Sequence, residues 1–276
     1  MEAVKDINLE VLLDKVLEHS DVSAQNISIY LEELDDLTED RNINNAAIWN
    51  AETIYHPASL LKLFAALMAE EQMLSSESNL IQNTETNDEA VRAIEESIVV
   101  SDNDALGYLI DLVTDTVSGP ELEGEEFQDF KAKREGITKF FREKGYSENL
   151  KIPNKCFSFD KYGRDKQLAR FQENECTIKD IANLMKEIRV KKPQIYKFLK
   201  RDLKDESDYQ TRFIGAGLKN YTIESFYSKA GWTSKVRHDA AIINAKYLLV
   251  IMTKGLSEHK DLIPRISMEI FSALRE

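Results

Sequence analysis

The stretch from residue 225 to residue 255 constrains the fold most, because it consists of three short segments rich in β-forming residues. They read SFYSKAGW (225–232), DAAIINA (239–245) and KYLLVIMTKG (246–255). Segments of this kind, separated by few or no polar residues, are typical of neighbouring antiparallel strands joined by tight turns. We therefore predict three antiparallel strands near the C-terminus.

Two further strands are expected near the N-terminus. ISIYL (27–31) alternates, which places its isoleucines and its leucine on one face of a strand and Ser28 and Tyr30 on the other. The polar stretch 35–45 then turns the chain, and AAIWNAE (46–52) follows as a second strand. A single sheet would therefore be assembled from both ends of the chain.

Helical patterns occupy much of the remaining chain. Apolar residues recur at helical spacing over residues 7–19 and again from Ile263 onward. TIKDIANLMKEI is the clearest helix, and its first residues, Thr177 and Asp180, resemble a capping box. The segment 119–174 is polar and irregular, and it carries no clear pattern.

These elements together indicate an α+β fold. We predict one antiparallel sheet that is built from both chain ends and flanked by the terminal helices, with a mostly helical lobe inserted. We expect residues 1–52 and 205–276 to form the sheet domain and residues 53–204 to form the inserted helical domain.

Charge and composition exclude several classes of partner. The chain has 276 residues and a formal net charge of −13, whereas phosphate binding needs a basic surface. We therefore expect neither nucleic acid nor anionic membrane as a partner. Cys156 and Cys176 lack zinc-binding spacing, so we expect two free thiols, no metal and no cofactor.

The N-terminal residues lack the long apolar core and the cleavage-type ending of a signal peptide. No run approaches the roughly 18 apolar residues that a membrane span needs. The chain as given would be cytoplasmic, or extracytoplasmic if a leader had been removed.

Three short motifs carry possible chemistry. In HPASLLKLF, Ser59 and Lys62 lie three residues apart, after a proline that suits the first turn of a helix. SDN occurs at 101–103, and KAG occurs at 229–231 inside a predicted strand. Spacing alone decides nothing, because Ser-x-x-Lys recurs at two other places, Ser158/Lys161 and Ser257/Lys260.

The order and context of these motifs resemble those of class A β-lactamases and of the wider superfamily that includes penicillin-binding transpeptidases, whose signature is Ser-x-x-Lys, Ser-Asp-Asn and Lys-Thr-Gly. Here Ala230 takes the place of the threonine. The resemblance covers nearly the whole chain and is weak from about 115 to 175. It implies the superfamily's fold and a bacterial protein with a role in the response to antibiotics.

The resemblance also implies roles for the residues of the motifs. Ser59 would be the nucleophile and Lys62, on the same helix face, its base. For this the pKa of Lys62 must fall, which burial or a second cation such as Lys229 would achieve. Ser101 would pass the proton to the leaving nitrogen, and Asn103 would hold the amide of the substrate.

Further residues are expected to bind the substrate. The backbone N–H groups of Ser59 and Trp232 would form the oxyanion hole. Arg237 would bind the substrate carboxylate, with His238 as the alternative polar group. Thr233 or Ser234 would compensate for the hydroxyl that Ala230 lacks.

One expected residue is missing. Class A β-lactamases carry a Glu-x-x-x-Asn motif before the helix that corresponds to TIKDIANLM, and its glutamate activates the water that hydrolyses the acyl-enzyme. The segment 156–176 contains no such motif. Its acidic candidates are Asp160, Asp165, Glu173 and Glu175.

We therefore expect a serine acyl hydrolase that acts on β-lactams through an acyl-enzyme at Ser59 and deacylates slowly. Two alternatives stay open. One is a D,D-peptidase-like enzyme acting on D-Ala-D-Ala-type peptides of peptidoglycan. The other is a binding protein with the β-lactamase fold and vestigial catalysis.

Overall fold

The computed structural model describes residues 4, 7–18, 21–34, 46–75, 84–157 and 162–274. The chain forms two compact units. Met1–Leu60 and Thr177–Glu276 make up one, which we call the sheet unit, and Leu61–Cys176 make up the other, the helical unit. The domain boundaries expected at 52/53 and 204/205 stay a prediction.

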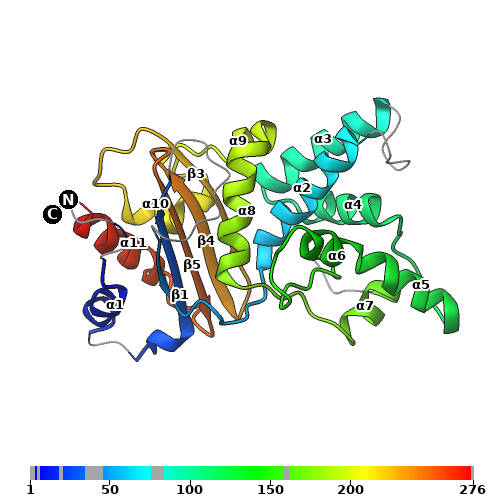
Figure 1. Cartoon of the computed structure of the whole chain (residues 1–276), viewed down its shortest axis with the longest axis horizontal. Helices are drawn as coiled ribbons and strands as arrows, with labels where there is room; N and C mark the ends of the chain where they lie inside the picture. The colour runs from blue at the N-terminus through cyan, green and yellow to red at the C-terminus, as the bar shows by residue number, and fades with distance from the viewer. Residues whose placement is uncertain are drawn as a thin grey trace. The chain divides into compact units, whose positions relative to one another are not determined.

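A five-stranded antiparallel sheet is the centre of the sheet unit, as predicted (Figure 1). Its strands run in the order β2-β1-β5-β4-β3. Their bounds are β1 Ile27–Glu33, β2 Ala46–Trp49, β3 Phe226–Trp232, β4 Val236–Ile243 and β5 Tyr247–Lys254. β1 pairs with β5, with Ile29 opposite Ile251, so the two ends of the chain meet in the middle of the sheet.

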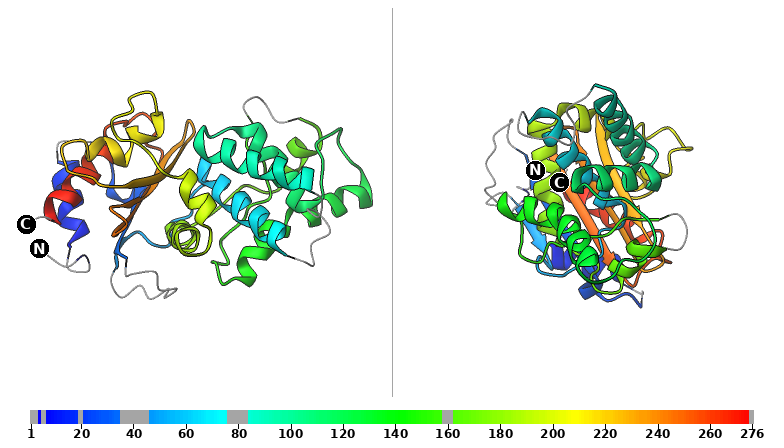
Figure 2. Two further views of the ribbon diagram at one scale, coloured as in Figure 1. Left: turned by 90° about the horizontal axis from the view of Figure 1, so that it is seen from above. Right: turned by 90° about the vertical axis from the view of Figure 1, so that its right-hand side faces the viewer.

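Helices cover both faces of this sheet (Figures 1 and 2). The apolar residues of α1 (Leu9–Leu17) and α11 (Leu262–Ala273) share one core with Ile27, Ile29 and Leu31 of β1. On the other face, Lys186 of α8 (Ile178–Lys191) forms an ion pair with Glu32 at 3.0 Å. Both sides of β1 are therefore buried, although the sequence alternates.

The sheet unit also contains the short helical segments that lie near β3. These are α9 (Pro193–Phe198), η5 (Tyr209–Arg212) and α10 (Ile214–Gly217), with η4 (Ala58–Leu60) at the end of the N-terminal part and η2 (Ala24–Asn26) before β1. At the start of α8, Thr177 and Asp180 form the capping box that the sequence predicts.

The helical unit consists of six helices among its described residues. They are α2 (Leu61–Leu74), α3 (Thr84–Val99), α4 (Asn103–Thr114), α5 (Gly124–Arg134), α6 (Gly136–Glu143) and α7 (Gly163–Ala169). The segment 119–174, which carries no clear sequence pattern, is held by the buried guanidinium of Arg134. This group contacts Asp111 at 2.8 Å and Asp165 at 2.9 Å. Removing one partner of such a buried pair typically costs about 3–5 kcal/mol, so this network fixes the short helices to each other.

Candidate active site

Ser59 lies in η4, where the backbone is strained. The preceding residue, Ala58, has a φ of 50°, a left-handed backbone conformation that residues other than glycine rarely adopt. The amide of Ala58 donates to Nδ1 of His56 at 3.0 Å. Strain of this kind persists only where the surroundings impose it, and it concentrates at functional sites.

His238 of β4 anchors the segment that leads to Ser59. Its ring is fully buried, with Nε2 2.9 Å from the carbonyl oxygen of His56 and Nδ1 accepting from the amide of Thr253 at 3.2 Å. Burial lowers the pKa of His238 to about 4, so the ring is neutral at physiological pH. The sequence suggested His238 as the alternative polar group for binding the substrate carboxylate. Its contacts in the structure hold the segment before Ser59.

The backbone of β3 passes directly against Ser59. A Cβ atom placed on Gly231 would lie 2.7 Å from the backbone nitrogen of Ser59, closer than real Cβ contacts occur. Only glycine permits this approach. The third residue of the KAG motif must therefore be glycine, because η4 lies against it.

The hydrogen-bond pattern of β3 orients the amide of Trp232. β3 is an edge strand, and the amide of Thr233 donates into the sheet at 2.9 Å. Successive amides alternate in direction, and those of Ser228 and Ala230 accordingly donate outward, that of Ala230 to Oε1 of Gln210 at 3.3 Å. The N–H of Trp232 points the same way, to the open edge.

Lys229 lies buried beneath this edge. Its Nζ donates to Oε1 of Gln210 and to the carbonyl of Ala230, each at 2.9 Å. Asp239, which is also fully buried, faces Ala230 across the β3–β4 pair. Burial raises the pKa of Asp239 to about 7, against the opposing effects of the amide of Ile214 and the charge of Lys229.

In the helical unit, Lys62 meets Asn103. The side chain of Lys62 is fully buried, and its Nζ donates to Oδ1 of Asn103 at 2.7 Å. Asp102 caps α4 by accepting from the amide of Ala105 at 2.7 Å. Ser101 has a φ of 62°, so the SDN motif is a strained turn at the start of α4.

Burial lowers the pKa of Lys62 to about 8. The negative charges of Cys156 and Asp102 oppose this shift, so Cys156 is close enough to act on the ammonium group. From the sequence, Cys156 was expected only to be a thiol outside any metal site, and its effect on Lys62 was not predicted. The contribution expected of Lys229 to the pKa of Lys62 stays a prediction.

The predicted substrate-binding residues of the sheet unit lie together. Trp232, Thr233 and Arg237 line one pocket with a volume of about 510 Å³. Of the predicted site residues, the sheet unit thus holds Ser59, Lys229, Trp232, Thr233 and Arg237, and the helical unit holds Lys62, Ser101 and Asn103.

The acidic candidates for a deacylating base have other surroundings. Asp165 is buried and bonded to Arg134 and to the hydroxyl of Ser118. Glu175 is paired with Lys151 at 2.8 Å, and Glu173 is exposed. Asp160 lies outside the described residues, as do Ser158 and Lys161.

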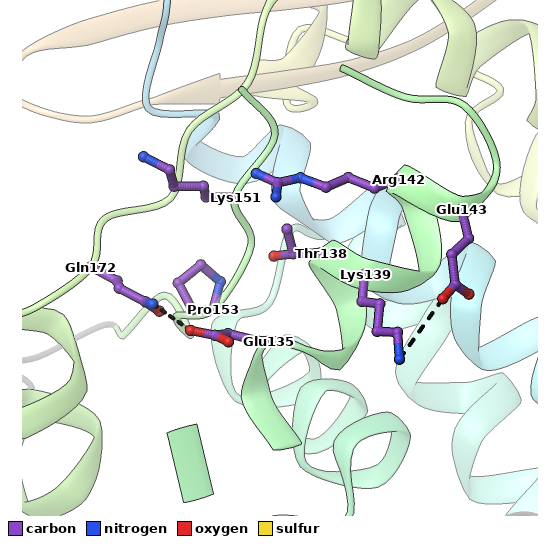
Figure 3. Close-up of a pocket in the computed structure, with 8 residues that line it drawn as sticks. All are labelled: Glu135, Thr138, Lys139, Arg142, Glu143, Lys151, Pro153 and Gln172. Carbon is purple, nitrogen blue, oxygen red and sulfur yellow. Dashed lines mark hydrogen bonds and ion pairs between the residues drawn. The ribbon is translucent and has the colours of Figure 1, made fainter. Parts of the chain in front are cut away.

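A separate pocket of about 520 Å³ lies in the helical unit (Figure 3). Within it, Lys139 pairs with Glu143 at 3.9 Å and the amide of Gln172 donates to Glu135. Lys151 and Arg142 pair instead with Glu175 and Glu148, which do not line it. None of the predicted site residues lines it.

Neither a metal-binding cluster of His, Cys, Asp or Glu side chains nor a helix able to span a membrane occurs in the described part of the chain. Neither Cys156 nor Cys176 forms a disulfide within the described residues.

Comparison with known proteins identifies the family. A model of the β-lactamase enzyme family matches residues 8–274, and the chain therefore belongs to that family. A search of curated proteins gave no significant match.

Several solved structures share the fold. A mutant of PBP-A, in its acyl-enzyme complex with penicillin G, is 19% identical over 96% of this chain and 95% of that chain, with a TM-score of 0.61. The β-lactamase from Sphaerobacter thermophilus DSM 20745 is 15% identical over 97% of this chain and 98% of its own, with a TM-score of 0.63. The β-lactamase from Streptosporangium roseum is 13% identical over 96% and 97%, also with a TM-score of 0.63. The predicted α+β fold and superfamily are confirmed.

The pKa of Lys62 can be measured directly. In the protein labelled with ¹³C and ¹⁵N at lysine, and assigned through a Lys62→Arg variant, the side-chain resonances of Lys62 should titrate near pH 8. Cys156→Ala should lower this midpoint further, because it removes a charge that opposes the shift. A midpoint in the ordinary lysine range of about 10.4 would contradict the assignment.

Proposed function

We propose that this member of the β-lactamase enzyme family is a serine acyl hydrolase that opens β-lactams through an ester at Ser59. The observation that carries the proposal is the contact between β3 and η4. It brings the backbone of Ser59 against Gly231, next to the outward-pointing amide of Trp232. Two backbone N–H groups that converge on one point can stabilise a developing oxyanion, and each is typically worth about 3 kcal/mol. The contact supports this role for the amides of Ser59 and Trp232.

The proposed acylation is a proton relay. The Oγ of Ser59 attacks the carbonyl carbon of the lactam, and its proton passes to the neutral amine of Lys62. The tetrahedral intermediate collapses with cleavage of the C–N bond; Ser101 gives its proton to the leaving nitrogen and takes up the proton that Lys62 had accepted. The lowered pKa of Lys62 supports this role, since at pH 8 about half of such lysines carry a free electron pair.

Two further residues hold the reactants. Asn103 accepts a hydrogen bond from Lys62, and its amide group is proposed to hold the amide of the substrate. Lys229 is proposed to attract the substrate carboxylate. Its hydrogen bond to Gln210 supports a fixed position for the ammonium group.

Slow deacylation is part of the proposal. Hydrolysis of the ester needs an activated water, and Asp165 and Glu175 are already engaged with Arg134 and Lys151. Neither they nor the exposed Glu173 has the spacing of the family's glutamate. A D,D-peptidase-like activity, which needs no dedicated glutamate, is the alternative that this observation favours; a vestigial binding protein is the other.

Covalent labelling tests the nucleophile. A fluorescent penicillin should label the protein at Ser59, and Ser59→Ala should abolish labelling because it removes the hydroxyl to which the label is attached. Ser257→Ala and Ser158→Ala are the matched controls, since each alters another Ser-x-x-Lys copy. Labelling of Ser59→Ala at the parent level would refute the assignment.

Gly231→Ala tests the contact that carries the proposal. The added Cβ must push β3 away from Ser59, so acylation should slow by on the order of 100-fold, as when an oxyanion donor is lost. Gly136→Ala is the control, because among the described residues beyond its own helix backbone and chain neighbours no atom lies within 4 Å of its added Cβ. If a folded Gly231→Ala protein acylates at the parent rate, the proposed oxyanion site is wrong.

The rate at which the acyl-enzyme is hydrolysed tests the proposal of slow deacylation. Intact-protein mass spectrometry after mixing with a penicillin should show an adduct that persists, and steady-state kinetics should show a burst of one equivalent before a slow phase. Rapid turnover without a burst would contradict slow deacylation, and single substitutions at the four acids would then locate the base. Absence of both adduct and turnover, with peptides ending in D-Ala-D-Ala also inert, would favour the binding-protein alternative.

A further inference from the structure

The cavity of about 520 Å³ in the helical unit is built around one face of α6 (Figure 3). Its lining residues between Glu135 and Glu143 are spaced three or four positions apart, so their side chains share that face. The remaining wall comes from Lys151, Pro153 and Gln172. All these residues belong to the helical unit, and none takes part in the proposed acylation. A cavity of this size can hold a small organic ligand.

Arg142 places a fixed guanidinium on this face of α6. Its Nη2 donates to the carbonyl oxygens of Glu148 and Leu150, the latter at 2.9 Å. These carbonyls hold the group in place without neutralising it. The carboxylate of Glu148 lies 3.8 Å from Nη1, and its side chain is 90% exposed. An exposed ion pair of this length contributes little, so the charge of Arg142 is available to a ligand.

Three polar groups of the lining are only partly satisfied by the described residues. The Nε of Arg142 is buried, and no described residue accepts its hydrogen. The hydroxyl oxygen of the buried Thr138 accepts from the amide of Ile152 at 2.8 Å, but its own hydrogen has no acceptor there. Nε2 of Gln172 donates to Glu135, and since a carboxylate only accepts, this bond fixes the orientation of the amide. Oε1 of Gln172 is then a buried acceptor that no described donor reaches. Buried polar groups are almost always hydrogen-bonded in native proteins, so these groups point to a ligand in the cavity.

The other charged groups of the lining have partners. Lys151 lies 2.8 Å from Glu175, and Lys139 lies 3.9 Å from Glu143. The remaining carboxylate, Glu135, accepts the amide hydrogen bond described above. The guanidinium on α6 is therefore the charge that a ligand would neutralise. A planar, fixed guanidinium that is not hydrogen-bonded to a carboxylate favours a carboxylate as its ligand.

We propose that this cavity binds an N-acyl amino acid, free or as the end of a peptide, with its carboxylate at Arg142 and Thr138 and its amide N–H at Oε1 of Gln172. A carboxylate alone has no donor for Gln172, and an amide alone has no charge for Arg142. An N-acyl amino acid carries both groups on neighbouring atoms. An ammonium group also donates, but burying it costs more than burying a neutral amide. The proposal does not depend on the proposed function.

Binding is tested on the full chain with N-acetylglycine, followed by NMR through the Nε–H signal of Arg142, which triple-resonance spectra assign without a variant. N-acetylglycine should shift this signal, because its carboxylate would accept the hydrogen. Acetoxyacetate, in which an ester oxygen replaces the N–H, and N-acetylglycinamide, which lacks the charge, should each bind about tenfold more weakly. Glycine, whose nitrogen is charged, should also bind more weakly than N-acetylglycine.

Variants locate the two ends of the ligand. Gln172→Leu removes the acceptor, so it should weaken N-acetylglycine about tenfold and leave the affinity for acetoxyacetate within about twofold. Thr138→Val keeps the shape of the side chain without its hydroxyl, and it should weaken both compounds about threefold. Lys166→Gln is the matched control, since it alters an exposed lysine of the same unit that does not line the cavity. Arg237→Gln is the control for the sheet unit, and neither control should change binding. Should Gln172→Leu fail to fold, the comparison of compounds on the parent protein still decides.

A longer probe distinguishes the two sources of the ligand. If N-acetyltriglycine binds more tightly than N-acetylglycine, the cavity binds the end of a peptide; equal affinity indicates a free N-acyl amino acid, and both results uphold the site. An Arg142 signal that no compound shifts would mean that water alone fills the cavity, and it would overturn the proposal. Equal binding of N-acetylglycine and acetoxyacetate, or binding that Arg237→Gln abolishes and Gln172→Leu leaves unchanged, would overturn it as well. Acylation of Ser59 has no bearing on these outcomes.

Discussion

The pairing of β1 with β5 is the constraint on which the rest of the sheet unit depends. It joins segments from opposite ends of the chain, with Ile27 opposite Thr253. β4 lies next to β5, and its His238 holds the segment before Ser59. β3 is the next strand of the same sheet, and its Gly231 lies against Ser59.

Local patterns in the sequence were sufficient for the strands and for the α8 cap, because alternation, turn residues and capping side chains act within a few residues. The motifs singled out Lys62 and Asn103, but the hydrogen bond between them was not predicted, and the roles of these residues stay predictions. The outward direction of the Trp232 amide follows from parity along β3 once one amide of the strand is known to point inward.

Other features of the site arise from contacts that no local pattern encodes. Gln210 reaches Lys229 from a short helical segment nineteen residues earlier in the chain. Cys156 acts on Lys62 from a segment with no periodicity. The alternation of β1 could not reveal that both its faces are covered, because the cover on the second face comes from α8, far along the chain.

His238 and Asp239 are neighbours on β4, and both are fully buried. Burial lowers the pKa of His238 and raises the pKa of Asp239. The folded state holds His238 with a pKa of about 4 instead of 6.5, so its contribution to stability rises with pH across that window. The folded state holds Asp239 with a pKa of about 7 instead of 3.8, so the contribution of Asp239 to stability falls as the pH rises across nearly the same range. The two contributions therefore oppose each other in mild acid, and the titration of either buried residue is masked by that of its neighbour in any measurement of stability against pH.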